Sequence, residues 1–111
     1  MDDFDSYRAE MNEKLLGSGH LGIKRFFALD TQAYEDGALD KKTKELIALA
    51  LGVAAHCDAC IGFHVQTLVK LGATKAEVEE ALGMAVYMGG GPSLMYSANA
   101  IAAFKEFSDA S

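Results

Sequence analysis

The chain has 111 residues, of which 50% are hydrophobic, and a chain of this length suits one domain with a single core. The formal net charge of −6 argues against nucleic acid as a partner, because there is no basic stripe to neutralise phosphates. No run of roughly eighteen apolar residues is present and the first residues are acidic, so we expect no membrane span, no signal peptide and a cytoplasmic location.

The same composition predicts self-association. A domain of this size fills its core and still has apolar side chains left over. Apolar surface that a small protein cannot hide in its own core is commonly buried between subunits. We therefore expect a homo-oligomer.

Helical periodicity accounts for the first part of the chain. Apolar residues recur at three- and four-residue spacing, namely Phe4, Tyr7, Met11 and Leu15. This first predicted helix stops at Gly17–Gly19. A second helix is predicted from about Leu21 to Glu35, and Asp40 is a candidate N-cap for a third.

The next segment predicts the centre of the fold. From Leu46 to Ala55 nearly every residue is apolar, which does not suit a helix at the surface, so we expect this third helix to be central. Gly52 within it would allow a neighbouring helix to approach closely. A fourth helix is predicted over Asp58–Leu71, closed by Gly72 at the C′ position.

Two further helices complete the chain. Thr74 and Glu77 have the spacing of a capping box and open the fifth helix. Gly89–Pro92 interrupts the chain, and the proline suits the first turn of a sixth helix that ends near Phe107. No alternating strand pattern is present, so the predicted fold is all-α, a single domain of about six helices over residues 1–111.

Both cysteines and two of the three histidines lie within residues 56–64. On a helix, Cys57, Cys60 and His64 share one face. A thiol at a helix start becomes more acidic than its ordinary pKa of about 8.5, and the imidazole is placed to relay a proton. Two residues between cysteines allow a disulfide. In a reducing compartment, the pattern predicts a redox pair or a metal site before a structural staple.

Glu45 stands directly before the apolar run. If the third and fourth helices fold back on each other, Glu45 and His64 lie at similar heights. A carboxylate on a mostly apolar helix face needs a partner, which predicts a relay from Glu45 through His64 to Cys60. A surface glutamate that pairs with Lys41 or Lys42 fits the spacing equally well.

Four residues together, Glu45, Cys57, Cys60 and His64, resemble the alkylhydroperoxidase D-like branch of the carboxymuconolactone decarboxylase family. The glutamate precedes the Cys-x-x-Cys by twelve positions, the histidine follows it by four, and the resemblance spans about Phe27 to Phe107. It implies an all-helical protomer assembled as trimers or hexamers. It also implies thiol-dependent reduction of a peroxide or exchange with a disulfide, with electrons from a dithiol such as a lipoyl-bearing protein. A thioredoxin-type donor is the other candidate, and we expect no cofactor and no metal.

The resemblance also implies a role for each residue. Cys60 attacks the peroxide and becomes a sulfenic acid, Cys57 resolves it into a disulfide, and Glu45 with His64 relays the proton. A purely local argument favours Cys57 as the nucleophile instead, because it lies nearer the helix start.

One departure from the family pattern concerns Ala59. The better-studied peroxidases of this branch have a histidine just before the second cysteine, and this chain has Ala59 there. The resemblance therefore leaves the rate of peroxide reduction undecided for this chain, even if its disulfide chemistry is retained. His56 stands before the first cysteine instead, where one interpretation is that it partly compensates for the missing histidine. We favour the other interpretation, a helix-end residue without a catalytic part.

Three alternatives remain at this point. A metal site could use the cysteines and nearby histidines, but ligands from one helix approach an ion from one side only. Decarboxylation of a lactone acid, for which the wider family is named, needs cationic groups, and the arginines are limited to Arg8 and Arg25. A non-catalytic oligomeric or binding protein is the third alternative.

Overall fold

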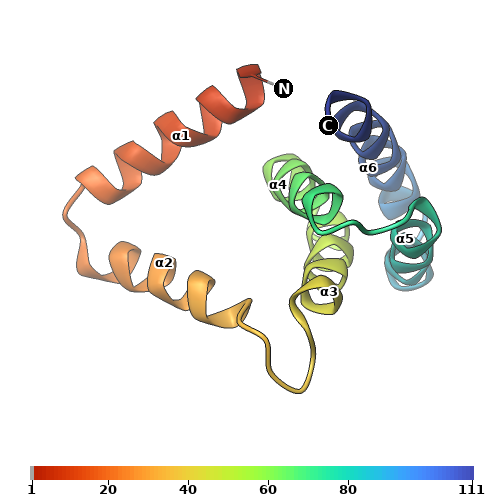
Figure 1. The fold of residues 1–111 in the computed structure, drawn as a ribbon, viewed down its shortest axis with the longest axis horizontal. Coiled ribbons are helices and arrows are strands. Elements are labelled where there is room, and N and C mark those ends of the chain that lie inside the picture. Colours follow the sequence, from red (N-terminus) through yellow and green to blue (C-terminus); the bar gives the residue numbers. More distant parts are fainter. Residues whose placement is uncertain (1) are drawn as a thin grey trace. The chain divides into compact units, whose positions relative to one another are not determined.

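A computed structural model describes residues 2–111, and within that range the chain forms six helices and no strand. The helices are α1 (Asp2–Gly17), α2 (Leu21–Ala33), α3 (Lys41–Ala54), α4 (Asp58–Lys70), α5 (Lys75–Gly89) and α6 (Gly91–Ala110) (Figure 1). The predicted all-α class, the number of helices and the Cys-x-x-Cys at a helix start are confirmed. None of the described helices is both long enough and apolar enough to cross a bilayer.

The chain divides into two compact units at Asp40. The first unit contains α1 and α2, joined by a short turn in which Gly19 has a positive φ of 76°. His20 caps α2, because its Nδ1 accepts a hydrogen bond from the Gly22 backbone N–H at 3.1 Å. The second helix ends at Ala33, two residues earlier than the predicted Glu35. A single domain over residues 1–111 stays a prediction.

The second unit, Lys41–Ser111, holds the main core. Helix α3 packs against α4, α5 and α6. Its central position follows from the apolar side chains that it contributes, and the fully buried members of the core are Leu49, Val53, Val65, Leu68 and Ala100. The predicted central place of this helix is therefore confirmed.

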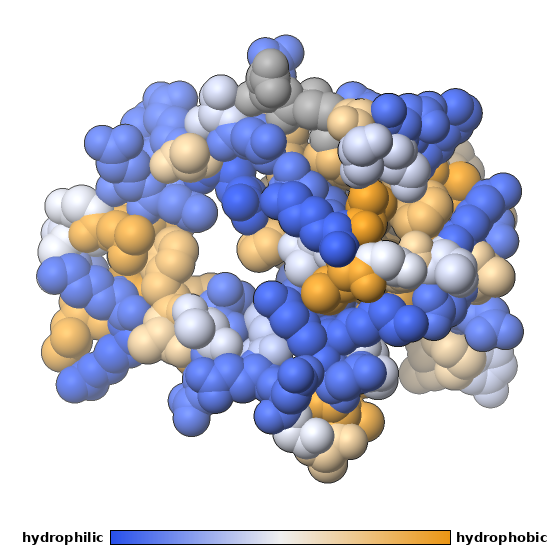
Figure 2. Space-filling model, in the orientation of Figure 1, coloured by the Kyte–Doolittle hydropathy of each residue, from blue (hydrophilic) through white to orange (hydrophobic). Residues whose placement is uncertain are grey.

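Burial of α3 is nevertheless one-sided. Ile47 is 47% exposed and Leu51 is 65% exposed, because the three neighbouring helices cover only part of the α3 surface. On the face drawn in Figure 2, apolar side chains likewise lie exposed between polar ones. The helices of the second unit thus leave apolar surface uncovered, as the composition predicts.

The helix ends follow local capping rules. Gly72 (φ 78°) closes α4 at C′, and the Ala73 N–H returns to the Leu68 carbonyl at 3.0 Å. Thr74 and Glu77 form the predicted capping box, with hydrogen bonds of 2.9 and 3.1 Å. These local signals are readable in the sequence because each involves residues only a few positions apart.

The glycine-rich segment separates the last two helices. Gly90 has a φ of 71°, and Pro92 lies in the first turn of α6, as predicted. The sixth helix continues to Ala110, three residues beyond the predicted Phe107. No capping glycine or proline follows Phe107, so nothing in the local sequence stops the helix there.

Candidate functional site

The site is built on the turn between α3 and α4. The His56 N–H donates to the Val53 carbonyl at 3.1 Å, and the Cys57 N–H donates to the Gly52 carbonyl at 3.0 Å. These two bonds, with His56 at a left-handed φ of 56°, form a Schellman turn that closes α3. The predicted placement of His56 at a helix end is confirmed.

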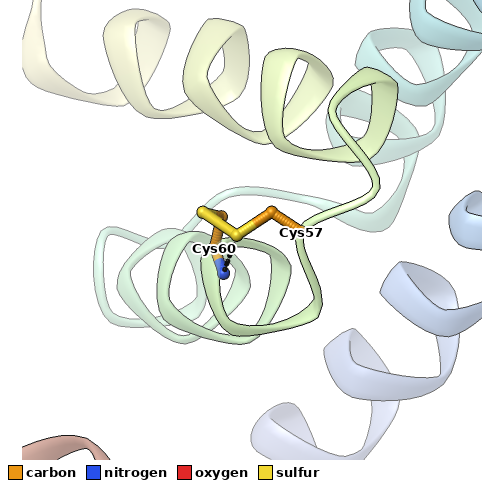
Figure 3. The surroundings of a disulfide bond; sticks show 2 residues. All are labelled: Cys57 and Cys60. Carbon is orange, nitrogen blue, oxygen red and sulfur yellow. Dashed lines mark hydrogen bonds between the residues drawn. A yellow bond between two sulfur atoms is a disulfide. The ribbon is translucent and has the colours of Figure 1, made fainter. Parts of the chain in front are cut away.

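Cys57 belongs to this turn and also caps α4. Its backbone is extended (φ −109°, ψ 96°), and its Sγ accepts a hydrogen bond from the Cys60 N–H at 3.2 Å. The two cysteines form a disulfide, with their Cα atoms 5.2 Å apart (Figure 3). The unpaired N–H groups of a helix N-terminus stabilise negative charge, so a Cys57 thiolate would be favoured here once the disulfide is reduced.

Gly52 fixes the position of the second cysteine. A Cβ placed on Gly52 would lie 3.2 Å from the Cys60 Cβ, which is tighter than an ordinary contact. The first turn of α4 therefore lies directly against α3, and Figure 3 shows the disulfide in the space between the two helices. The predicted close helix crossing at Gly52 is confirmed.

A buried acid–imidazole pair joins α3 and α4 at a distance of one to two helical turns from the disulfide. Glu45 of α3 and His64 of α4 approach to 2.7 Å between Oε2 and Nδ1. Their side chains are 2% and 12% exposed, respectively. A carboxylate that is almost completely buried requires such a partner, because an unpaired charge in the interior is costly.

The alternative of a surface Glu45 is wrong, because its side chain is only 2% exposed and is bonded to His64. Lys42 instead forms an ion pair with Glu77 of α5, with 2.8 Å between Nζ and Oε2. The hydrogen bond from Lys42, followed by that from the Thr74 backbone, lowers the pKa of Glu77 below its ordinary value. The sequence could not decide between these partners, because a pair with Lys41 or Lys42 forms within α3, whereas the pair with His64 depends on how α3 and α4 pack.

His64 also lies near the disulfide along α4. Residues four positions apart on a helix are neighbours on one face, with Cβ atoms roughly 5–6 Å apart, so His64 and Cys60 are adjacent. The Phe63 ring is nearly parallel to the imidazole, with ring centroids 5.2 Å apart. The arrangement places an imidazole, which can bind and release a proton, beside a disulfide, which can be reduced to two thiols.

Two aromatic residues of the site were missed by sequence reasoning. Phe63 flanks His64, and Tyr96 of α6 stacks on His56 with centroids 4.6 Å apart and planes 5° apart. Phe63 could have been suspected as a direct neighbour of His64. No sequence signal connects Tyr96 to the cysteines, since they are brought together only by packing.

Among the residues described, no group of three histidine, cysteine or acidic side chains is arranged to hold a metal ion. Both sulfurs are engaged in the disulfide, and Nδ1 of His64 is engaged with Glu45. The metal alternative would therefore need a rearranged set of ligands.

Comparison with known proteins extends this picture. The family model of the carboxymuconolactone decarboxylase family matches residues 23–103. A solved carboxymuconolactone decarboxylase family protein from Legionella pneumophila is 54% identical, with a TM-score of 0.83, over 97% of this chain and 99% of that one. A protein from Thermotoga maritima is 38% identical, with a TM-score of 0.94, over 99% of this chain and 96% of its own. A second structure of that Thermotoga protein is described as that of a carboxymuconolactone decarboxylase family protein, with a suggested involvement in antioxidative response.

A further relative is an uncharacterised protein of Cupriavidus necator, 43% identical over 72 residues. The match covers 65% of this chain and 64% of the relative, so this chain spans less than two thirds of that protein's length.

Proposed function

Because the chain belongs to the carboxymuconolactone decarboxylase family and has a disulfide at the start of α4, we propose that it is a thiol-dependent oxidoreductase that reduces peroxides or exchanges disulfides. The observation that carries the proposal is the Cys57–Cys60 disulfide at a helix N-terminus, beside the buried Glu45–His64 pair. The suggested antioxidative involvement of the Thermotoga relative agrees with it.

In the first step, the Cys60 thiolate attacks one oxygen of the peroxide bond. The O–O bond breaks, a sulfenic acid forms on Cys60, and the leaving alkoxide or hydroxide takes up a proton. We assign this role to Cys60 because it matches the family pattern and lies next to His64 along α4.

In the second step, the Cys57 thiolate attacks the sulfur of the sulfenic acid. A disulfide forms and the hydroxide that leaves is protonated to water. The resolving sulfur has to be a thiolate, and the N-terminus of α4 supplies the hydrogen-bond donor that stabilises one, the Cys60 N–H at 3.2 Å. A dithiol donor of the lipoyl or thioredoxin type then reduces the disulfide and becomes oxidised itself.

The Glu45–His64 pair serves the proton transfers. The Glu45 carboxylate accepts from Nδ1 of His64, which fixes the ring and its tautomer and leaves Nε2 as the atom that exchanges protons. In this scheme Glu45 is a positioning residue and His64 the acid and base. Glu45→Gln keeps the side-chain volume but loses the charge, so it should slow peroxide turnover and alter its pH profile.

The test is peroxide consumption with dihydrolipoyl and thioredoxin-type donors compared side by side. Cys60→Ser should abolish turnover, whereas Cys57→Ser should allow a single attack and leave a sulfenic acid that dimedone labels. The two variants control for each other, because each lacks the disulfide and only one lacks the attacking sulfur. Full activity of Cys60→Ser would overturn the assignment, and labelling in that variant alone would reverse the two roles.

Ala59 offers a way to distinguish the two proposed activities, which are peroxide reduction and disulfide exchange. It is exposed in the first turn of α4, at the position where related peroxidases have a histidine. Ala59→His should raise peroxide turnover and leave exchange with a model disulfide unchanged. Efficient disulfide exchange by the unmodified protein with slow peroxide turnover would favour a disulfide oxidoreductase.

The exposed apolar surface supports assembly into a homo-oligomer. A hollow of about 370 Å³ between α3 and α5 is lined almost wholly by apolar side chains, including Leu46, Ile47, Leu51, Met84 and Met88. We propose trimers or hexamers, working in the cytoplasm where dithiol donors are kept reduced. Light scattering coupled to size-exclusion chromatography tests the assembly, and a monomer at all concentrations would refute it.

A further inference from the structure

His56 occupies a backbone position that usually requires glycine. Both α3 and α4 end in a Schellman turn, and α4 has Gly72 (φ 78°) at the left-handed position where α3 has His56 (φ 56°). A side chain in this conformation costs roughly 1–2 kcal/mol relative to a helical one, and glycine avoids the cost. Histidine is one of the residues that occur in this conformation more often than most, and a contact outside the turn can offset its cost.

The imidazole ring of His56 supplies that contact. It stacks on Tyr96 of α6 with centroids 4.6 Å apart and planes 5° apart, and Tyr96 is half-buried. A stacked ring pair contributes about 0.5–1.5 kcal/mol beyond its buried area, which is the same order as the backbone cost. The stack can thus hold the turn against α6, which packs on α4.

Cys57 follows His56 directly in the chain and belongs to the same turn. Its N–H is bound to the Gly52 carbonyl of α3, and its Sγ caps α4 through the Cys60 N–H. In the oxidised protein, the disulfide also ties Sγ to the first turn of α4. In the dithiol state that bond is gone, and only the turn and the cap keep the sulfur at the helix N-terminus.

We propose that His56 and Tyr96 are positioning residues for Cys57, whose stack keeps Sγ at the N-terminus of α4 while the pair is reduced. This deepens the proposed function and rests on it, because a resolving cysteine must be available as a thiolate. Neither ring takes part in a bond change. Their contribution is to raise the thiolate population of Cys57 by holding it near the backbone N–H groups.

The experiment follows the Cys57 thiol alone, in the full chain with Cys60→Ala. The rate of alkylation by iodoacetamide is measured as a function of pH. The midpoint, which is the pH at which the rate reaches half of its maximum, reports the formation of the Cys57 thiolate. His56→Ala removes one ring and leaves a side chain at the left-handed position, so the backbone cost stays without the stack that offsets it, and Tyr96→Leu removes the other ring. Each should raise the midpoint, with the thiolate fraction at neutral pH lowered by about threefold or more. Asp58, the acidic neighbour in the first turn of α4, is present in every variant.

Two comparisons separate positioning from other effects. Tyr96→Phe preserves the stack and should retain the original midpoint, and the double variant should shift no further than either single one, because both act through one contact. A direct effect of the His56 charge predicts a shift for His56→Ala and none for Tyr96→Leu, and that result would overturn the proposal. Unchanged midpoints in both variants, with only the unfolding temperature lowered, would show a purely structural stack.

This measurement uses neither a peroxide nor an electron donor. A protein that fails to turn over peroxide or disulfide would refute the proposed function and leave the alkylation result as it stands. Unaltered midpoints would remove the positioning role and leave the redox proposal intact.

Discussion

The contact between Gly52 and Cys60 gives the sharpest quantitative prediction. In the interior of an exposed helix, glycine to alanine stabilises a protein by roughly 0.5–1 kcal/mol, because glycine loses more backbone freedom on folding. Gly52 lies inside α3 and is buried, so its replacement adds a methyl group where α4 crosses. Backbone propensity and packing therefore act in opposite directions at this position.

The distances indicate that packing prevails. The added Cβ would lie 3.2 Å from the Cys60 Cβ, and two backbone atoms of α4, Cys60 C and Ile61 N, follow at 3.9 Å. Carbon atoms pack best at about 3.5–4.0 Å, so the first turn of α4 has to move, since no rotamer change of Cys60 shifts its Cβ. Overpacking of this kind costs about 1–3 kcal/mol, so Gly52→Ala should lower the free energy of unfolding by about 1 kcal/mol.

Gly83 provides the matched control. It lies inside α5, is exposed, and an added Cβ there meets no atom within 4 Å. Gly83→Ala should therefore raise the free energy of unfolding by roughly 0.5–1 kcal/mol. Urea unfolding followed by circular dichroism measures both variants, and they should differ by about 2 kcal/mol.

The Cys57–Cys60 pair gives a second measurement on the same variants. If Cys60 moves with the first turn of α4, Gly52→Ala should change the rate at which the reduced cysteines close into a disulfide, and Gly83→Ala should not. Equal stabilisation of the two variants, with unchanged closure rates, would refute the close approach of α4 to Gly52.

Three further predictions concern the helix contacts around the site. His64→Leu leaves the Glu45 carboxylate buried without its partner and should lower the free energy of unfolding by about 3 kcal/mol, whereas replacing both residues by leucine should cost much less; equal losses in urea unfolding would contradict the pair. Glu77→Gln keeps the capping-box acceptor and removes the charge that Lys42 binds. Because the pKa of Glu77 is lowered in the folded state, the advantage of the unmodified protein over this variant should be present at neutral pH and disappear as the pH falls through that lowered pKa, and unfolding at a series of pH values tests this. Thr74→Ala should cost about 1 kcal/mol by removing the cap of α5, whereas thermal unfolding of Thr74→Ser should be almost unchanged.

The limits of the sequence appear most clearly at Glu45 and His56. For Glu45, the spacing allowed either a buried pair with His64 or a surface pair with a lysine, and the 19 positions between glutamate and histidine are bridged only when α3 and α4 pack. For His56, the sequence predicted a helix end, but its contact with Tyr96 depends on where α6 lies against the turn. In both cases the missing information is the relative position of helices that are distant along the chain.

By itself, the sequence determined the six helices, the Gly72 end of α4, the capping box of α5 and the glycine break before α6, and it placed Cys57, Cys60 and His64 at the start of one helix and along it. These features depend on hydrogen bonds and side-chain spacings within a few residues, so local chemistry is sufficient for them. Only the tertiary structure decided which partner Glu45 takes, how closely Cys60 approaches Gly52, and which side of α3 is covered by α4, α5 and α6. Those outcomes depend on packing between helices, where a shift of a few tenths of an ångström changes which atoms meet, and no local pattern specifies such a shift.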